Sequence, residues 1–297
     1  MKIDIKGHSG CKIDIIRENG DLLIEKSTSN PKYFERLIKQ AKKQESAICV
    51  DSKMFAVPKI FNILESTDMC SIKMEYIYSR NYIEYFEKSG LEEITHFTDS
   101  IINYIESEIK QSSPQLINSS IIELKINDIL LASKQNSCLK TNFDVLENIE
   151  NACAIIKQNC CNIIIPVGIC HGDLTFSNIL FSGTKYYLID FLDSFIESPI
   201  IDIVKVRQDT EFGWSKLMYM KSFDKIRLNI ISNKIDQAIN SHFSKYEWYN
   251  KYYKLFQLIN FLRIIQYASD SIVIKYLNDI IKKMIYEFNI NCANSSR

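Results

Sequence analysis

A short polar segment between two apolar runs constrains this sequence more than any other feature. The run 162–170 is almost wholly apolar and leads into His171-Gly172-Asp173-Leu174-Thr175-Phe176-Ser177-Asn178. A second apolar run, 186–190, follows a Ser-Gly turn and ends on Asp190. This pattern predicts short buried strands separated by turns. The polar groups of both segments are therefore expected to meet at one end of the strands.

Asp173, Asn178 and Asp190 combine groups that suit phosphate chemistry. Phosphoryl transfer requires a protein mainly to hold a triphosphate, to neutralise it with a metal ion and to orient a hydroxyl. Asp173 is placed to accept the proton of that hydroxyl or to orient it. Asn178 and Asp190 offer the oxygen ligands that Mg²⁺ prefers.

The same residues resemble the aminoglycoside phosphotransferase and choline kinase group of kinase-like enzymes. His171-Gly172-Asp173, with Asn178 five positions later, matches the group's H-G-D-(x)4-N loop, and Ile189-Asp190-Phe191 matches its metal-binding segment. Protein kinases carry H-R-D-(x)4-N and D-F-G instead, so Gly172 favours the small-molecule branch. The resemblance implies a kinase that uses ATP (or GTP) and Mg²⁺ to phosphorylate a hydroxyl of a small molecule.

The resemblance also implies a role for each residue and a fold. His171 supports the loop, Asp173 is catalytic, and Asn178 and Asp190 hold the metal ions. Asp202, at the end of the group's later "P…D" segment, is expected to be structural. The implied fold is α+β and bilobal, with a small N-terminal antiparallel sheet lobe that carries one helix and a larger, mainly helical C-terminal lobe.

The first 78 residues read as strands around one helix. Asn19-Gly20 predicts a type I′ hairpin, because both central residues of that turn need positive φ. Pro31 begins an amphipathic helical stretch. The expected strands are 2–5, 11–16, 21–26, 55–61 and 71–77.

From Asn81 onward the apolar spacing is helical. Ser112-Ser113-Pro114 is expected to be a turn, Asn142 the N-cap of a helix that runs to about Gln158, and residues 215–290 helical throughout. We therefore expect a nucleotide-binding lobe, residues 1–78, and a helical C-terminal lobe, residues 79–297, with the catalytic loop and the acceptor site.

Several N-terminal residues fall where the resembled group binds its nucleotide. Gly7, Ser9 and Gly10 lie between two strands, where small residues let backbone amides approach phosphates. Glu75 and Ile77 resemble the hinge, whose backbone groups bond the adenine edge. Each of these positions also has a plain structural interpretation, a turn in the first case and a buried strand in the second.

Lys26 takes the position of the group's ATP-binding lysine, near the end of the third expected strand. In the group, a helix glutamate pairs with this lysine. Here Gln40 falls near that position, with Glu35 and Glu45 out of register. The residue that pairs with Lys26 stays open at this level.

Composition excludes several other classes of protein. The chain has 297 residues, no formal net charge and nine cysteines without a Cys-x-x-Cys pair. The zero net charge gives no sign of a nucleic-acid partner, and we interpret the cysteines as reduced core thiols. No run reaches the roughly 18 apolar residues of a membrane span, so the expected location is cytoplasmic, with no membrane partner. The oligomeric state stays open.

The charge is unevenly distributed, which bears on the acceptor. Residues 212–297 contain thirteen Lys or Arg and six Asp or Glu. This surplus disfavours a polycationic acceptor and favours a neutral or anionic one, such as a sugar or sugar derivative. A choline or amino-alcohol kinase, an aminoglycoside kinase, and a catalytically dead kinase fold that binds a nucleotide or a partner remain alternatives. A protein kinase is disfavoured, because no A-P-E-like segment follows Asp190.

Overall fold

The N-terminal part of the chain is built on a five-stranded antiparallel sheet. A computed structural model describes residues 5–6, 11–47 and 55–295. The strand order in this sheet is β1-β2-β3-β6-β5. The strands are Ile5–Lys6 (β1), Lys12–Glu18 (β2), Asp21–Thr28 (β3), Ile60–Glu65 (β5) and Cys70–Glu75 (β6).

The β2–β3 hairpin confirms the predicted turn. Asn19 and Gly20 have φ values of 52° and 94°, and Glu18 pairs with Asp21 across the turn. A type I′ turn needs positive φ at both central positions, which Asn and Gly tolerate best. The local sequence therefore sets the register that places Lys26 in β3.

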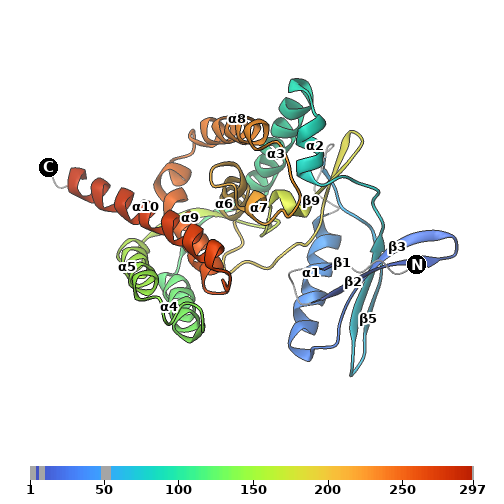
Figure 1. Cartoon of the computed structure of the whole chain (residues 1–297), viewed down its shortest axis with the longest axis horizontal. Coiled ribbons are helices and arrows are strands. Elements are labelled where there is room, and N and C mark those ends of the chain that lie inside the picture. The colour runs from blue at the N-terminus through green and yellow to red at the C-terminus, as the bar shows by residue number, and fades with distance from the viewer. Residues whose placement is uncertain (1–4, 7–10, 48–54, 296–297) are drawn as a thin grey trace.

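One helix covers a face of this sheet (Figure 1). A 3₁₀ turn, Pro31–Tyr33, leads into α1, Phe34–Ala47. Leu37 and Ala41 of α1 pack with Ile72 of β6 in a small core of their own. The helix is thereby fixed against the strand next to Lys26.

The segment 55–61 is not the single strand that we expected. Phe55–Ala56 (β4) pairs in parallel with β10, Lys185–Leu188, whereas β5 begins only at Ile60. Pro58 lies between the two strands, and its lack of an N–H interrupts a ladder. β4 therefore joins a second sheet, of order β4-β10-β9, with β9 at Ile179–Ser182.

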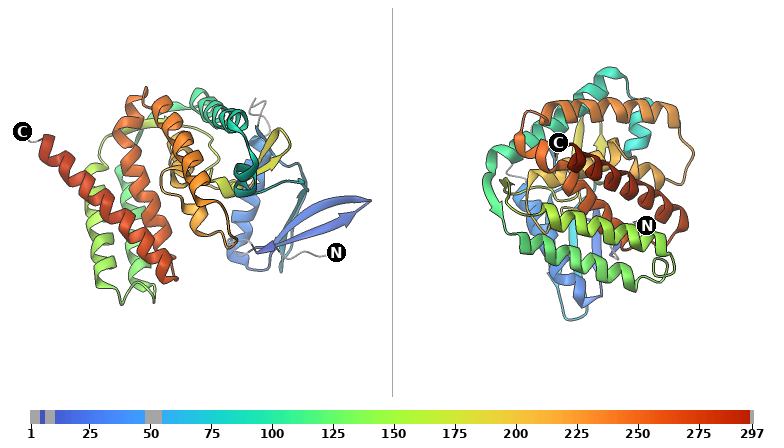
Figure 2. Two further views of the ribbon diagram at one scale, coloured as in Figure 1. Left: turned by 45° about the horizontal axis from the view of Figure 1, so that its top comes forward. Right: turned by 90° about the vertical axis from the view of Figure 1, so that its left-hand side faces the viewer.

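The rest of the chain is mainly helical and is largely separate from the five-stranded sheet (Figures 1 and 2). Asn81 and Asn142 cap α2 and α5 as Asn side chains commonly do, and the second of these caps was predicted. Residues 218–224 are not helical, so the stretch 215–290 is interrupted. The helices are Tyr82–Lys88 (α2), Leu91–Gln111 (α3), Ser119–Gln135 (α4), Phe143–Asn159 (α5), Pro199–Thr210 (α6), Trp214–Leu217 (α7), Lys225–Phe243 (α8), Glu247–Ile265 (α9) and Ser271–Ser295 (α10).

We expected a turn at Ser112–Pro114, but this was wrong: only Ser112 lies outside a strand. Ser113–Ile117 forms β7, which pairs antiparallel with β8, Ile163–Val167. Pro114 lies opposite Pro166, which is tolerated because each strand of a two-stranded ribbon has an open edge. The second strand of this ribbon ends shortly before the polar segment that begins at His171.

No helix in the described part of the chain is long and apolar enough to cross a membrane. The architecture is α+β, as expected, with the sheet and α1 on one side and the large helical core on the other.

Candidate active site

Asp173 and Asn178 are in direct contact. The Asn178 side-chain amide donates to the main-chain oxygen of Asp173 at 2.8 Å and to its Oδ2 at 3.0 Å. A short 3₁₀ turn, Phe176–Asn178, brings the two residues together, and the N–H of Phe176 donates to Asp209 at 2.7 Å. The five-residue spacing of the motif thus closes a tight loop.

His171 is a buried support beneath this loop. Its Nδ1 accepts from the N–H of Asp173 at 3.2 Å, and its Nε2 lies 2.9 Å from the carbonyl oxygen of Ile189. Burial lowers the pKa of His171, so the ring is neutral at neutral pH. With Nδ1 as the acceptor, the hydrogen-bond network assigns the proton to Nε2, which donates to Ile189.

Asp202 accepts hydrogen bonds from the backbone of this loop, which fits the structural role expected for it. Its carboxylate accepts from the N–H of His171 at 2.5 Å and from that of Gly172 at 2.8 Å. Glu108 of α3 also accepts from the N–H of His171, at 3.2 Å. Burial, together with the charge of Asp202, raises the pKa of Glu108 well above its ordinary value. This raised pKa favours a protonated Glu108, so that one proton can lie between the two carboxyls under the loop.

Gly172 is required by the local geometry. Its φ is +84°, and a Cβ at this position would collide with the carbonyl oxygen of Leu192. The N–H of Leu192 in turn donates to the carbonyl of His171 at 3.0 Å. The H-G-D segment is thus locked against the segment that follows Asp190.

Asp190 lies where the two parts of the chain meet. The residue has φ +60°, and the N–H of Ile189 donates to the carbonyl of Asn178 at 3.1 Å. Lys26 Nζ lies 2.7 Å from Asp190 Oδ1, with side-chain exposures of 6% for the lysine and 42% for the aspartate. Lys26 thus contacts Asp190 directly, and the backbone of Ile189, the residue before Asp190, joins this position to Asn178 and through it to Asp173.

Asp190 takes the place of a helix partner for Lys26. Gln40 and Lys26 line the same small cavity, of about 10 Å³, but no described side chain of α1 forms an ion pair with Lys26. Glu35 pairs instead with Lys39 at 2.8 Å, and Glu45 is exposed. The partner of Lys26, left open by the sequence, is therefore Asp190 in this structure.

α1 contacts the segment that follows Asp190 through Lys43 rather than through a partner of Lys26. Lys43 Nζ donates to the carbonyl of Leu192 at 2.8 Å and pairs with Glu197 at 2.6 Å. This contact ties α1 to the segment after Asp190.

The predicted hinge and phosphate-loop residues are only partly described. Glu75 ends β6, its N–H donates to the carbonyl of Lys59 at 2.8 Å, and Ile77 lies two residues beyond the strand. Gly7, Ser9 and Gly10 lie outside the described residues. The hinge and loop assignments stay predictions.

Sequence reasoning missed Lys205, which lies on α6 beside the catalytic loop. Lys205 Nζ lies 3.0 Å from Asp173 Oδ1, and the lysine side chain is only 10% exposed. Burial raises the pKa of Asp173, but the charge and hydrogen bond of Lys205 outweigh this and hold it below its ordinary value. One signal was available, since Lys205, like Asp202, is a charged residue within the otherwise apolar stretch Ile200–Val206 on a wholly buried helix.

The oxygen atoms of the site fit a magnesium ion. Asn178 uses its amide nitrogen within the loop, so its Oδ1 is left for a ligand, and Asp190 is bonded to Lys26 through only one oxygen. No three His, Cys, Asp or Glu side chains of the described residues form an all-protein metal cage. Mg²⁺ commonly takes one or two protein ligands together with phosphate oxygens and water, which this pair can provide.

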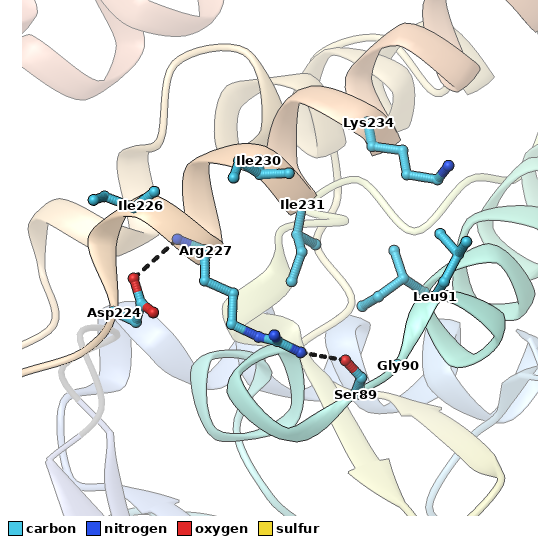
Figure 3. A pocket seen from close by; sticks show the side chains of 10 residues that line it. Ser89, Gly90, Leu91, Asp224, Ile226, Arg227, Ile230, Ile231 and Lys234 are labelled. Carbon is cyan, nitrogen blue, oxygen red and sulfur yellow. Dashed lines mark hydrogen bonds between the residues drawn. The ribbon is translucent and has the colours of Figure 1, made fainter.

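A larger hollow lies away from these residues. It has a volume of about 430 Å³ between the start of α3 and α8, and none of the predicted site residues lines it (Figure 3). Arg227 donates there to the carbonyls of Phe86 and Ser89. The guanidinium of Arg227 is therefore already bound to main-chain carbonyls at the end of α2.

The comparisons with known proteins agree with this geometry. Residues 162–218 match the model of the phosphotransferase enzyme family (APH). A search of curated proteins gives no significant match.

Three solved structures are similar to the chain. A choline/ethanolamine kinase family protein from Mesorhizobium loti is 14% identical, with a TM-score of 0.54 over 97% of this chain and 87% of that one. The GDP and kanamycin complex of APH(2")-IIia is 12% identical, with a TM-score of 0.60 over 97% and 93%. Spectinomycin phosphotransferase APH(9)-Ia, in complex with ADP and spectinomycin, is 10% identical, with a TM-score of 0.52 over 97% and 92%. The resemblance is thus confirmed: the chain has the kinase-like fold of these structures, and residues 162–218 match the model of the phosphotransferase enzyme family.

Proposed function

We propose that this protein transfers the γ-phosphate of a nucleoside triphosphate to a hydroxyl of a small molecule, with Mg²⁺. The observation that carries the proposal is the set of contacts among Lys26, Asp190, Asn178 and Asp173. This set supports a site in which Lys26 binds phosphates, Asn178 and Asp190 offer oxygen ligands to a metal ion, and Asp173 receives the hydroxyl. These are the parts that phosphoryl transfer needs.

In this proposal the two parts of the chain divide the work. Residues 1–78 bind the nucleotide, with Lys26 at its phosphates, and the backbone of Glu75 and Ile77 near its base. The N–H of Glu75 is engaged by Lys59, so we assign its carbonyl to the base. Residues 79–297 supply the catalytic loop and the acceptor site. The GDP and ADP in two similar structures support a purine nucleotide donor, either ATP or GTP.

The proposed reaction is a single displacement at phosphorus. The acceptor oxygen forms a bond to the γ-phosphorus while the bond to the β–γ bridging oxygen breaks, giving a phosphate ester and a nucleoside diphosphate. The hydroxyl proton passes to Asp173, whose depressed pKa keeps it ionised at neutral pH. Mg²⁺, when bound at Asn178 and Asp190, neutralises phosphate charge. Lys205 and the Asn178 amide hold the Asp173 carboxylate in place.

For the acceptor we propose a sugar or sugar derivative. The surplus of Lys and Arg in residues 212–297 supports a neutral or anionic compound over a polycation. Phosphorylation of a panel of sugars, amino alcohols and aminoglycosides tests this choice, and fast turnover of kanamycin-like compounds would contradict it.

Substitution of Asp173 tests the reaction itself. Asp173→Asn keeps the size and one hydrogen-bonding oxygen but cannot take a proton, so phosphoryl transfer should fall on the order of 10²-fold to 10⁴-fold. Nucleotide binding should persist. Asp99→Asn, at an exposed position of α3, is the matched control. Equal turnover in Asp173→Asn and the wild type would sink the assignment, whereas binding without turnover in the wild type would favour the catalytically dead alternative.

A further inference from the structure

Arg263 lies close to the proposed catalytic residues, although nothing in the motif points to it. It is near the end of α9, with its guanidinium carbon 5.4 Å from the centre of the Phe195 ring. Phe195 follows Asp190 by five residues and stacks on Phe256 of α9, with ring centroids 6.5 Å apart. An arginine over an aromatic face is held by cation–π attraction. Arg263 is thus fixed against the segment that contains Asp190.

A row of contacts places this face of α9 beside Asp173. Lys205 Nζ lies 3.0 Å from Asp173 and 3.5 Å from Gln208 Oε1. Asn260 of α9 donates to that same oxygen at 2.7 Å. Arg263 follows Asn260 by three residues, and residues with this spacing are neighbours on a helix surface. In agreement with this placement, the Asp173 charge acts to raise the pKa of Arg263.

Among the described residues, no side chain or carbonyl lies within hydrogen-bond or ion-pair distance of the Arg263 guanidinium. The guanidinium instead contacts the ring of Phe195. Burial lowers the pKa of Arg263, so the group is partly withdrawn from water. In contrast, Arg207 of α6 donates to Asp236, Asn240 and Tyr249. Arg263 is half-buried, so its five donors still reach water and can exchange that water for the acceptor oxygens of a ligand.

Besides Asp173, two cationic side chains interact electrostatically with Arg263. Arg36 of α1 acts to lower the pKa of Arg263, and Arg263 acts in the same way on Lys125 of α4, whose pKa is lowered mainly by burial. Asp173, the nearby carboxylate, already pairs with Lys205. An anion is therefore favoured beside Asp173, and a polycation is disfavoured.

We propose that Arg263 binds a carboxylate or phosphate group of the acceptor, whose hydroxyl is then presented to Asp173. This inference rests on the proposed phosphotransferase function and narrows its acceptor to an anionic hydroxyl compound. A planar guanidinium suits both anions because it can form two parallel hydrogen bonds to either.

Binding measurements test the proposal without requiring turnover. Protein saturated with Mg²⁺ and ADP is titrated in a calorimeter with glucose, glucuronate, glucose 1-phosphate and glucosamine. We expect at least one of the two anionic sugars to bind about 10-fold more tightly than glucose, because charge-assisted hydrogen bonds are worth more than neutral ones. Comparison of glucuronate with glucose 1-phosphate distinguishes a carboxylate site from a phosphate site.

Variants at Arg263 decide whether this residue causes the preference. Arg263→Met keeps the apolar stem on Phe195 and should remove the preference for the anionic sugar, while Arg263→Lys should keep part of it. Lys234→Met, at an exposed cation of the hollow by α8, is the control and should bind as the wild type does. Each variant is first checked for an unchanged melting temperature.

Three outcomes would overturn the proposal: no binding of either anionic sugar, binding of glucose or glucosamine as tight as that of the anions, or a preference that survives in Arg263→Met. The proposed reaction fails separately, through turnover that does not depend on Asp173. A protein that binds anions through Arg263 but transfers no phosphate would keep the binding site and lose the function.

Discussion

Lys205 and Asp173 form an ion pair of 3.0 Å between a buried helix and the catalytic loop. The pair fixes the proposed base from the side opposite to the Asn178 amide and keeps it ionised. Lys205 is in this sense a positioning residue, since it acts on Asp173.

Lys205→Met should therefore lower turnover more than it weakens nucleotide binding. A misplaced catalytic group can cost on the order of 100-fold in rate, and we expect a fall in kcat of that size with little change in the KM for nucleotide. Lys205→Arg keeps the charge and should restore part of the rate, which a merely structural role would not explain. Steady-state kinetics with both variants measures the split, and a proportional rise in nucleotide KM would contradict the positioning role.

The Glu108–Asp202 pair predicts a pH-dependent stability. The folded-state pKa of Glu108 is raised, so its contribution is fully present below its unfolded pKa and is lost as the pH rises through the folded value. Glu108→Gln imitates the protonated acid and has no proton to lose. The stability of the variant relative to the wild type should thus increase as the pH is raised.

Urea unfolding measures this difference. The wild type and Glu108→Gln are compared at several pH values from about 5 upward, in steps of about one unit. Glu106→Gln, at a carboxylate whose pKa is lowered, is the control and should not show the same rise. A difference between the wild type and Glu108→Gln that does not change with pH would refute a shared proton at this pair.

An added methyl group at Gly172 should lower the stability of the fold more than one at another glycine with positive φ. Gly172→Ala meets both a positive φ and the Leu192 carbonyl, whereas Gly183→Ala meets only a positive φ of 60°, with nothing within 4 Å of the added carbon. A residue other than Gly in the left-handed region lowers stability by roughly 1–2 kcal/mol. The collision with the Leu192 carbonyl adds to this loss. Chemical denaturation should show Gly172→Ala to be the less stable variant. Equal losses at the two sites would show that the loop can move away from Leu192.

The local signals in the sequence were sufficient for much of the fold. Asn19-Gly20 predicted the hairpin, and Asn142 predicted the start of α5. The H-G-D loop, the later Asn and the I-D-F segment predicted the match of residues 162–218 to the phosphotransferase enzyme family. Such signals work because turns and caps depend on the backbone preferences of a few adjacent residues.

Sequence reasoning failed where contacts join distant segments. Lys26 and Asp190 are 164 residues apart, and β4 pairs with β10 across the boundary that we expected between the lobes. Local spacing carries no information about which helix or strand will pack nearby. The pairing of Lys26 with Asp190 could therefore not be predicted from the spacing of residues near Lys26.

What the sequence alone determined is the order of the elements and the chemical groups of the catalytic segment, since both are encoded within short stretches of chain. The tertiary structure decided which charges meet there: Asp190 pairs with Lys26, Lys205 pairs with Asp173, and Arg263 has no acceptor among the described residues. The physical reason is that the neighbours of a charged group, and the water around it, are set only when the helices and the sheet pack together.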